Sequence, residues 1–189
     1  MKRTATDYFD GFIELFDIAV STDKTAEENV LTEAPELLRR SADKRSSLYK
    51  ALADEFLPPI EREDILDMIN ALHGLNAAAA ELKIARTLCP GAESRCGECM
   101  KRRTDMLMLT GKTVRELRSF KKPTRLLDYA KKIHTEYCAA VPQLAGEECA
   151  GADNRNFLQK KAICEKTGNF CAACERIACC AEQIAANNV

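Results

Sequence analysis

The sequence predicts an all-α protein, an antiparallel bundle of six long helices arranged as two successive three-helix repeats. Apolar residues recur at helical spacing along almost the whole chain, and no sustained alternation of β-branched or aromatic residues predicts a strand. Only 8 Gly and 6 Pro occur among 189 residues, so few turns and long elements are expected. No apolar run approaches the roughly 18 residues of a membrane span, and no signal peptide is apparent. We therefore expect a cytoplasmic protein.

The first expected helix follows two threonines that can cap it, and residues 21–23 are expected to end it. Its stripe consists of Phe9, Phe12, Ile13, Phe16 and Ala19. The second begins between residues 25 and 35 and ends at Phe56, because proline lacks the N–H that a helix needs and Pro58-Pro59 follows. Its stripe is Leu38, Ser41, Leu48, Leu52 and Phe56.

The third expected helix opens with acidic residues at 61–64, which complement the helix dipole, and ends at 89–91. Its stripe is Ile65, Met68, Leu72, Leu75, Ala79 and Leu82. The next helix covers 92–119. The fifth begins at Thr124 and carries Leu127, Ala130, Ile133, Tyr137, Val141 and Leu144, with Pro142 fraying its end before a loop at 146–153. The sixth covers 154–186, with Ile163, Phe170, Cys174, Ile177, Ala181 and Ile184 inward.

The charge distribution divides the chain into two unlike parts. Residues 1–90, the first predicted repeat, carry 11 Lys/Arg and 17 Asp/Glu, whereas residues 91–189, the second, carry 17 and 12. The densest basic segment, 101–132, holds 11 positive and 3 negative residues. It can contact an acidic partner or a membrane surface, or it is simply a solvated helical face. Aromatic residues do not interleave with these cations, so no nucleic-acid partner is expected.

The segment from Phe56 to Ile65, Phe-Leu-Pro-Pro-Ile-Glu-Arg-Glu-Asp-Ile, is followed by a long alanine-rich helix. It resembles the Phe-x-x-Pro-(Ile/Phe)-(Asp/Glu)-Arg-Glu-Asp-Ile signature of PhoU-like phosphate-transport regulators, in particular the branch that accompanies low-affinity inorganic-phosphate transporters. The opening Asp7-Tyr8-Phe9-Asp10 with Phe12 is also similar to that branch. The resemblance implies a non-enzymatic accessory protein that binds a phosphate transporter or its regulatory partner, and a homodimer is compatible with it.

The resemblance also implies metal binding through Glu/Asp-x-x-x-Asp pairs, in which carboxylates at i and i+4 converge on one hard cation. Only Asp43 keeps a carboxylate at the corresponding positions, so the family's iron clusters are not expected here. Both histidines, His73 and His134, fall on such positions. His134 and Cys138 form an i, i+4 pair of softer ligands suited to zinc or Fe(II). The alternative is a half-buried polar residue and a packed thiol.

All ten cysteines lie between Cys89 and Cys180, and two Cys-x-x-Cys units occur. If the fourth and sixth helices pack together, Cys96, Cys99, Cys171 and Cys174 can form an all-cysteine zinc site. Core packing and redox chemistry are the alternatives, so a thiol-based metal or redox sensor is the second function hypothesis. No phosphate-binding glycine loop or other enzyme signature is present, so neither catalysis nor an organic cofactor is expected.

Overall fold

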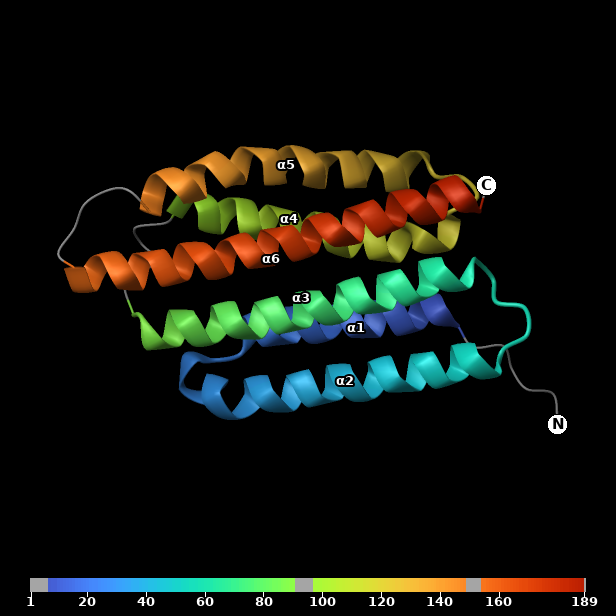
Figure 1. Cartoon of the computed structure of the whole chain (residues 1–189), viewed down its shortest axis with the longest axis horizontal. Coiled ribbons are helices and arrows are strands. Elements are labelled where there is room, and N and C mark those ends of the chain that lie inside the picture. Colours follow the sequence, from blue (N-terminus) through green and yellow to red (C-terminus); the bar gives the residue numbers. More distant parts are fainter. Residues whose placement is uncertain (1–6, 91–96, 149–153, 189) are drawn as a thin grey trace.

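The structure is a computed structural model that describes residues 7–90, 97–148 and 154–188, and all regular structure within these ranges is helical. The all-α expectation is therefore confirmed for the described part of the chain. Figure 1 shows the long helices running side by side. They are α1 (Tyr8–Lys24), α2 (Val30–Asp54), α3 (Arg62–Leu88), α4 (Gly97–Glu116), α5 (Thr124–Glu148) and α6 (Asn154–Asn187), with the short 3-10 turns η1 (Glu27–Asn29) and η3 (Leu117–Ser119).

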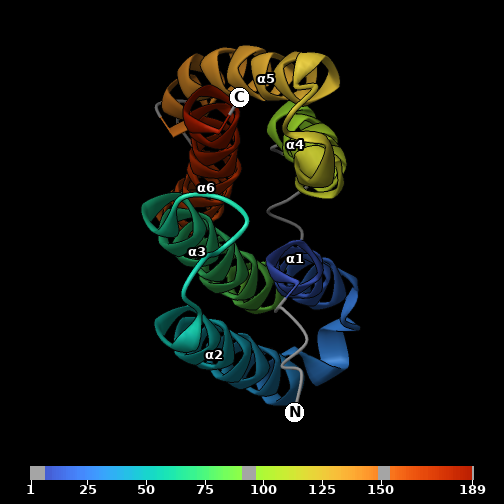
Figure 2. The same cartoon turned by 90° about the vertical axis from the view of Figure 1, so that its right-hand side faces the viewer.

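The helices gather in two groups when the bundle is viewed along its length (Figure 2). α1, α2 and α3 pack on one another, and α4, α5 and α6 do the same. The two groups meet mainly where α3 runs along α6, with a smaller contact between α1 and α4. Residues 91–96, next to the expected boundary near residue 90, lie outside the described ranges.

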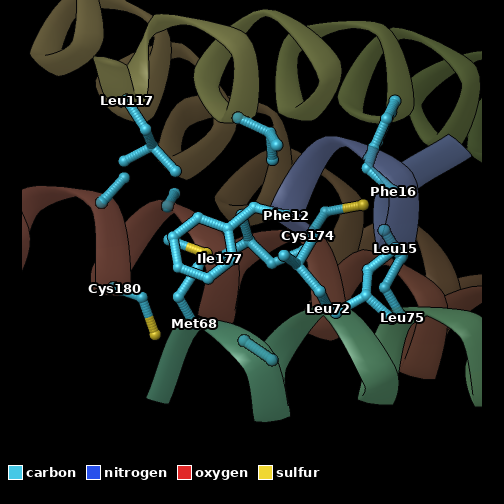
Figure 3. Packing of buried hydrophobic residues seen from close by; sticks show 14 of the residues in the cluster. Phe12, Leu15, Phe16, Met68, Leu72, Leu75, Leu117, Cys174, Ile177 and Cys180 are labelled. Atoms are coloured by element: carbon cyan, nitrogen blue, oxygen red, sulfur yellow. The ribbon is translucent and has the colours of Figure 1, made fainter. Parts of the chain in front are cut away.

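One large core joins the two groups (Figure 3). Phe12 and Leu15 from α1 and Leu72 from α3 lie against Cys174 and Ile177 from α6. Every residue of the apolar stripes predicted for the third and sixth helices is buried. Removing this apolar surface from water, at roughly 25 cal/mol per Å², is the main force that holds the bundle together.

Two helices continue past the ends that the sequence predicts. α1 continues through residues 21–23 to Lys24, and the hydroxyls of Ser21 and Thr22 donate to the carbonyls of Asp17 and Ile18, at 2.8 and 3.0 Å. These residues therefore find partners within the helix instead of ending it. α5 likewise runs past Pro142 to Glu148, into the segment expected to be a loop.

Three side chains expected in the core are exposed. α2 ends at Asp54, so Phe56 lies beyond the helix and is 89% exposed. In α5, Leu126 is buried while Leu127 is exposed, and Val141 is also exposed. The register predicted for α5 was therefore wrong by one residue at these two places. At each place two apolar residues are adjacent, Leu126 with Leu127 and Ala140 with Val141, and the spacing alone does not show which one is buried.

Ion pairs connect the acidic first group to the basic second group. They include Arg103–Asp23 at 2.5 Å, Arg115–Asp17 at 3.0 Å, Arg118–Asp7 at 3.1 Å and Lys166–Glu81 at 3.1 Å, and Arg118 also pairs with Asp10. Part of the basic segment 101–132 is therefore directed at α1 within the same chain. No helix in the described ranges is both long enough and apolar enough to cross a bilayer.

Candidate metal centre

Asp43 and His73, two positions singled out by the resemblance, lie in settings that do not favour a cation. Asp43 is exposed and paired with Arg39 at 2.7 Å, so a positive charge already occupies its carboxylate. Nδ1 of His73 lies 2.9 Å from Oγ of Ser41. Burial, together with the nearby Arg45, lowers the pKa of His73 and keeps the imidazole neutral. Within the described ranges, neither residue belongs to a group of three metal-ligating side chains.

The proposed all-cysteine site is not assembled from its described members, and Cys96 lies outside the described residues. Cys174 lies beside the side chain of Thr110 on α4. Thr110 is eleven residues beyond Cys99, about 16 Å along the helix. Cys99 and Cys174 therefore lie at different levels of the bundle, and Cys99, Cys171 and Cys174 do not form a ligand group.

Three thiols of α6 are core residues. Cys171, Cys174 and Cys180 are each less than 5% exposed. Burial raises the pKa of Cys171 and Cys180 to about 11 and that of Cys174 to about 12. A thiol with such a pKa stays protonated at neutral pH, and the thiolate is the form that attacks electrophiles and binds metals. The packing interpretation therefore applies to these three cysteines.

His134 is the predicted site residue that the structure does bring together with other ligands. Its Nδ1 lies 2.6 Å from Oε1 of Glu175, and its Nε2 lies 3.0 Å from Oε2 of Glu182. The two glutamates are seven residues apart on α6, two helical turns on the same face. The imidazole of α5 is thus held between two carboxylates of the neighbouring helix.

Cys179 completes the candidate ligand set. Single ligand atoms of His134, Glu175 and Cys179 all lie within 4.8 Å of one another. Neighbouring donors around tetrahedral zinc lie about 3.3–3.7 Å apart, given ligand bonds of about 2.0–2.3 Å, so side-chain movements of around 1 Å complete the geometry. Cys138 is exposed one turn further along α5 and does not belong to this group.

Protonation of the ligands sets how strongly they bind. Partial burial opposes charge on His134, but the hydrogen bonds that its ring donates to Glu175 and Glu182 outweigh it, so the pKa of His134 lies above its ordinary value. Burial and the same two carboxylates raise the pKa of Cys179. A metal ion must displace both protons, so its affinity rises with pH. Oε2 of Glu175 is buried and has no hydrogen-bond partner in the described part of the chain, which leaves one carboxylate oxygen available.

This chemistry suits a borderline cation. Imidazole nitrogen, thiolate sulfur and carboxylate oxygen together match zinc or Fe(II), whereas Mg²⁺ and Ca²⁺ prefer oxygen alone. Sequence reasoning identified His134 but missed Glu175, Cys179 and Glu182. The available signal was their i, i+4, i+7 spacing, which places all three on one face of α6.

Comparison with known proteins does not assign the chain to a family. No protein-family model matches it, and no curated protein matches it significantly. Inferences about the site therefore rest on the geometry of His134, Glu175, Cys179 and Glu182.

Proposed function

We propose that this protein is a PhoU-like accessory protein of inorganic-phosphate transport, which acts by binding a transporter or a signalling partner rather than by catalysis. The observation that carries the proposal is the position of the signature segment at the junction of the two helix groups. Ile60 and Ile65 enter the core, and the carboxylate of Asp64 accepts hydrogen bonds from Asn187 and Asn188 at the end of α6. The signature residues thus have structural roles suited to a bundle of two three-helix groups.

Phosphate uptake in living cells tests this proposal. Deleting the gene should alter the rate of radiolabelled phosphate uptake at high external phosphate, and a plasmid copy of the gene should restore it. A deletion strain whose uptake equals that of the parent, at both high and low phosphate, would count against the proposal. Deletion of an adjacent unrelated gene controls for effects on neighbouring transcription.

A second candidate function is metal-ion sensing, and the His134–Glu175–Cys179 group favours it. The ligands come from two different helices, so a bound ion links α5 to α6 and can change the surface that they present. An ion that binds the folded state and not the unfolded state also stabilises the protein. The gain is about 2.7 kcal/mol when the free ion concentration is a hundred times the dissociation constant.

Zinc titration of anaerobically purified protein, in competition with a chromogenic chelator, tests the second candidate. We expect one ion per chain, with affinity reduced at least about tenfold by His134→Gln and by Cys179→Ser. Cys138→Ser is the matched control, because that thiol is exposed on α5 but stands outside the group. Equal affinity in all variants, or clearly substoichiometric zinc and iron, would contradict a metal centre at this place.

A further inference from the structure

Phe56 and Leu57 form the most exposed apolar feature of the described chain. They are 89% and 79% exposed and adjacent in the loop between α2 and α3, which Figure 1 shows at one end of the bundle. Single exposed apolar residues are common on protein surfaces. Two neighbouring large side chains, both almost fully in water, are less common and mark a contact surface when the backbone holds them in place.

The base of this loop is held firmly. The guanidinium of Arg62 donates to the carbonyls of Leu52 and Glu55, at the end of α2. The Glu55 carboxylate accepts a hydrogen bond from the hydroxyl of Tyr8, at 2.6 Å. Ile60, on the other side of the loop, is only 4% exposed and belongs to the main core.

Between these fixed points lie Pro58 and Pro59, whose rings restrict the backbone further. The loop therefore presents Phe56 and Leu57 in a defined position although neither contributes to the core. Such pre-organisation reduces the entropy that is lost on binding a partner.

The charge around the loop indicates the kind of partner. Glu61 and Glu63 are exposed and make no ion pair with any described residue. Arg62, the basic residue between them, keeps its charge but directs its guanidinium at the backbone carbonyls at the end of α2. Exposed acids that follow an apolar pair in the same loop are complementary to an apolar pocket with a basic rim, and they are repelled by an anionic lipid surface.

We propose that Phe56 and Leu57 insert into an apolar pocket with a lysine- and arginine-rich rim on the cytoplasmic side of a membrane protein. This inference rests on the proposed function, in which the partner is a phosphate transporter. Cytoplasmic loops of membrane proteins carry an excess of Lys and Arg, which matches the exposed acids Glu61 and Glu63. Protein interfaces are enriched in aromatic side chains at a desolvated core that is surrounded by a polar rim.

Site-specific photo-crosslinking identifies the contact in cells. A photoreactive phenylalanine analogue is introduced at position 56 or 57 in a strain that produces the affinity-tagged phosphate transporter of the same genome. Both positions should crosslink to the transporter, and peptide mapping should locate the product at a Lys/Arg-rich loop. The matched control is position 158, because Leu158 is 64% exposed and belongs to the start of α6, which lies at the opposite end of the bundle from the loop (Figure 1). Equal crosslinking from position 158 would overturn the proposal.

Binding to the transporter in nanodiscs then measures the contribution of each group. The double variant Phe56→Ser/Leu57→Ser should bind at least about tenfold more weakly, because a hot spot of two apolar side chains is lost. Glu61→Lys/Glu63→Lys should also weaken binding and reduce its dependence on salt. Thermal unfolding of Phe56→Ser/Leu57→Ser should match that of the wild type, since the replaced side chains are exposed. Glu61→Lys/Glu63→Lys should unfold at a slightly lower temperature, because both acids stand at the N-terminus of α3.

The outcomes separate this inference from the proposed function. If the transporter binds wild type and the double variant equally, the loop assignment is wrong and the proposed function stands. If it binds neither, both are wrong. Phe56- and Leu57-dependent binding to vesicles of phosphatidylglycerol and phosphatidylcholine, without binding to the transporter, would make the loop a lipid-insertion element. A dimer that the double variant abolishes would make it a self-association surface, and either result overturns the proposal.

Discussion

Replacing Asp64 by asparagine should lower the free energy of unfolding by about 2–4 kcal/mol. The Asp64 carboxylate is 1% exposed and lies in the first turn of α3. Its Oδ1 accepts from the side-chain amides of Gln183 at 3.0 Å and Asn187 at 3.2 Å, and its Oδ2 accepts from Asn188 at 2.8 Å. These bonds connect the start of α3 to the end of α6.

The magnitude follows from the asparagine amide group. If the amide oxygen of the new asparagine takes the place of Oδ1 of Asp64, its NH₂ group takes the place of Oδ2. Two NH₂ groups then face one another, that of the new asparagine and that of Asn188. Asn188 cannot rotate without loss, because its Oδ1 accepts from the N–H of Glu61 at 3.1 Å and its Nδ2 donates to the carbonyl of Ile184 at 3.1 Å. One hydrogen bond to a charged acceptor, about 1.5–3 kcal/mol, is lost and a buried donor is left unpaired at about 1–3 kcal/mol. Partial relaxation reduces their sum to the stated range.

Urea unfolding followed by far-UV circular dichroism measures the change. Glu63→Gln is the control, because Glu63 lies in the same helical turn but is exposed and makes no hydrogen bond with a described residue. It should cost less than about 1 kcal/mol, the scale of a helix-dipole interaction. The reasoning fails if Asp64→Asn costs no more than this control.

Three further predictions concern helix packing, pH and thiol reactivity. Gly111→Ala should destabilise the protein by about 1–3 kcal/mol, because a Cβ there would lie 2.8 Å from the ring of Phe16 in α1. Gly74→Ala is the control: a Cβ there meets nothing within 4 Å, so the substitution should stabilise α3 by about 0.5–1 kcal/mol. The pKa of His134 is raised in the folded state, so its ionised form stabilises the fold at low pH, and this stability is lost as pH rises through the folded-state pKa. Urea unfolding should therefore find a larger stability difference between wild type and His134→Gln at about pH 5.5 than at about pH 8.5. Mass spectrometry after brief iodoacetamide treatment should find Cys138 alkylated and Cys174 unmodified until the protein unfolds.

Each of these three predictions has an outcome that would contradict it. A stability gain for Gly111→Ala would show that α1 and α4 do not approach closely at that point. A His134→Gln difference that grows with pH would reverse the assigned charge state. Alkylation of Cys174 in the native state at the rate of Cys138 would contradict its burial.

Much of the fold could be predicted because helical periodicity is a local property. The stripe from Ile65 to Leu82 could be read directly from the spacing of apolar residues, and each of its members is buried. The end of α2 at Asp54 was harder to predict, because the residue that binds the carbonyls there lies beyond the helix. Arg62, eight residues after Asp54, donates to the carbonyls of Leu52 and Glu55. Phe56 therefore leaves the helix and the core although its spacing from Leu52 fits the stripe.

The candidate site depends on which helices become neighbours. The sequence marks His134 as unusual, since it is one of two histidines and stands at a helical position shared with Cys138. Its partners Glu175, Cys179 and Glu182 lie about forty residues away, and only the packing of α5 on α6 brings them to it. Local spacing carries no information about such pairings.

By itself, the sequence determined that this protein is helical, where most helices begin and which stripes they bury, because the 3.6-residue period is set by the backbone. Tertiary structure decided what each cysteine and charge does. It buried Cys171 and Cys174 as packing residues, and it directed part of the basic segment 101–132 at α1. The physical reason is that burial and charge pairing depend on neighbours distant in the chain, which only packing selects.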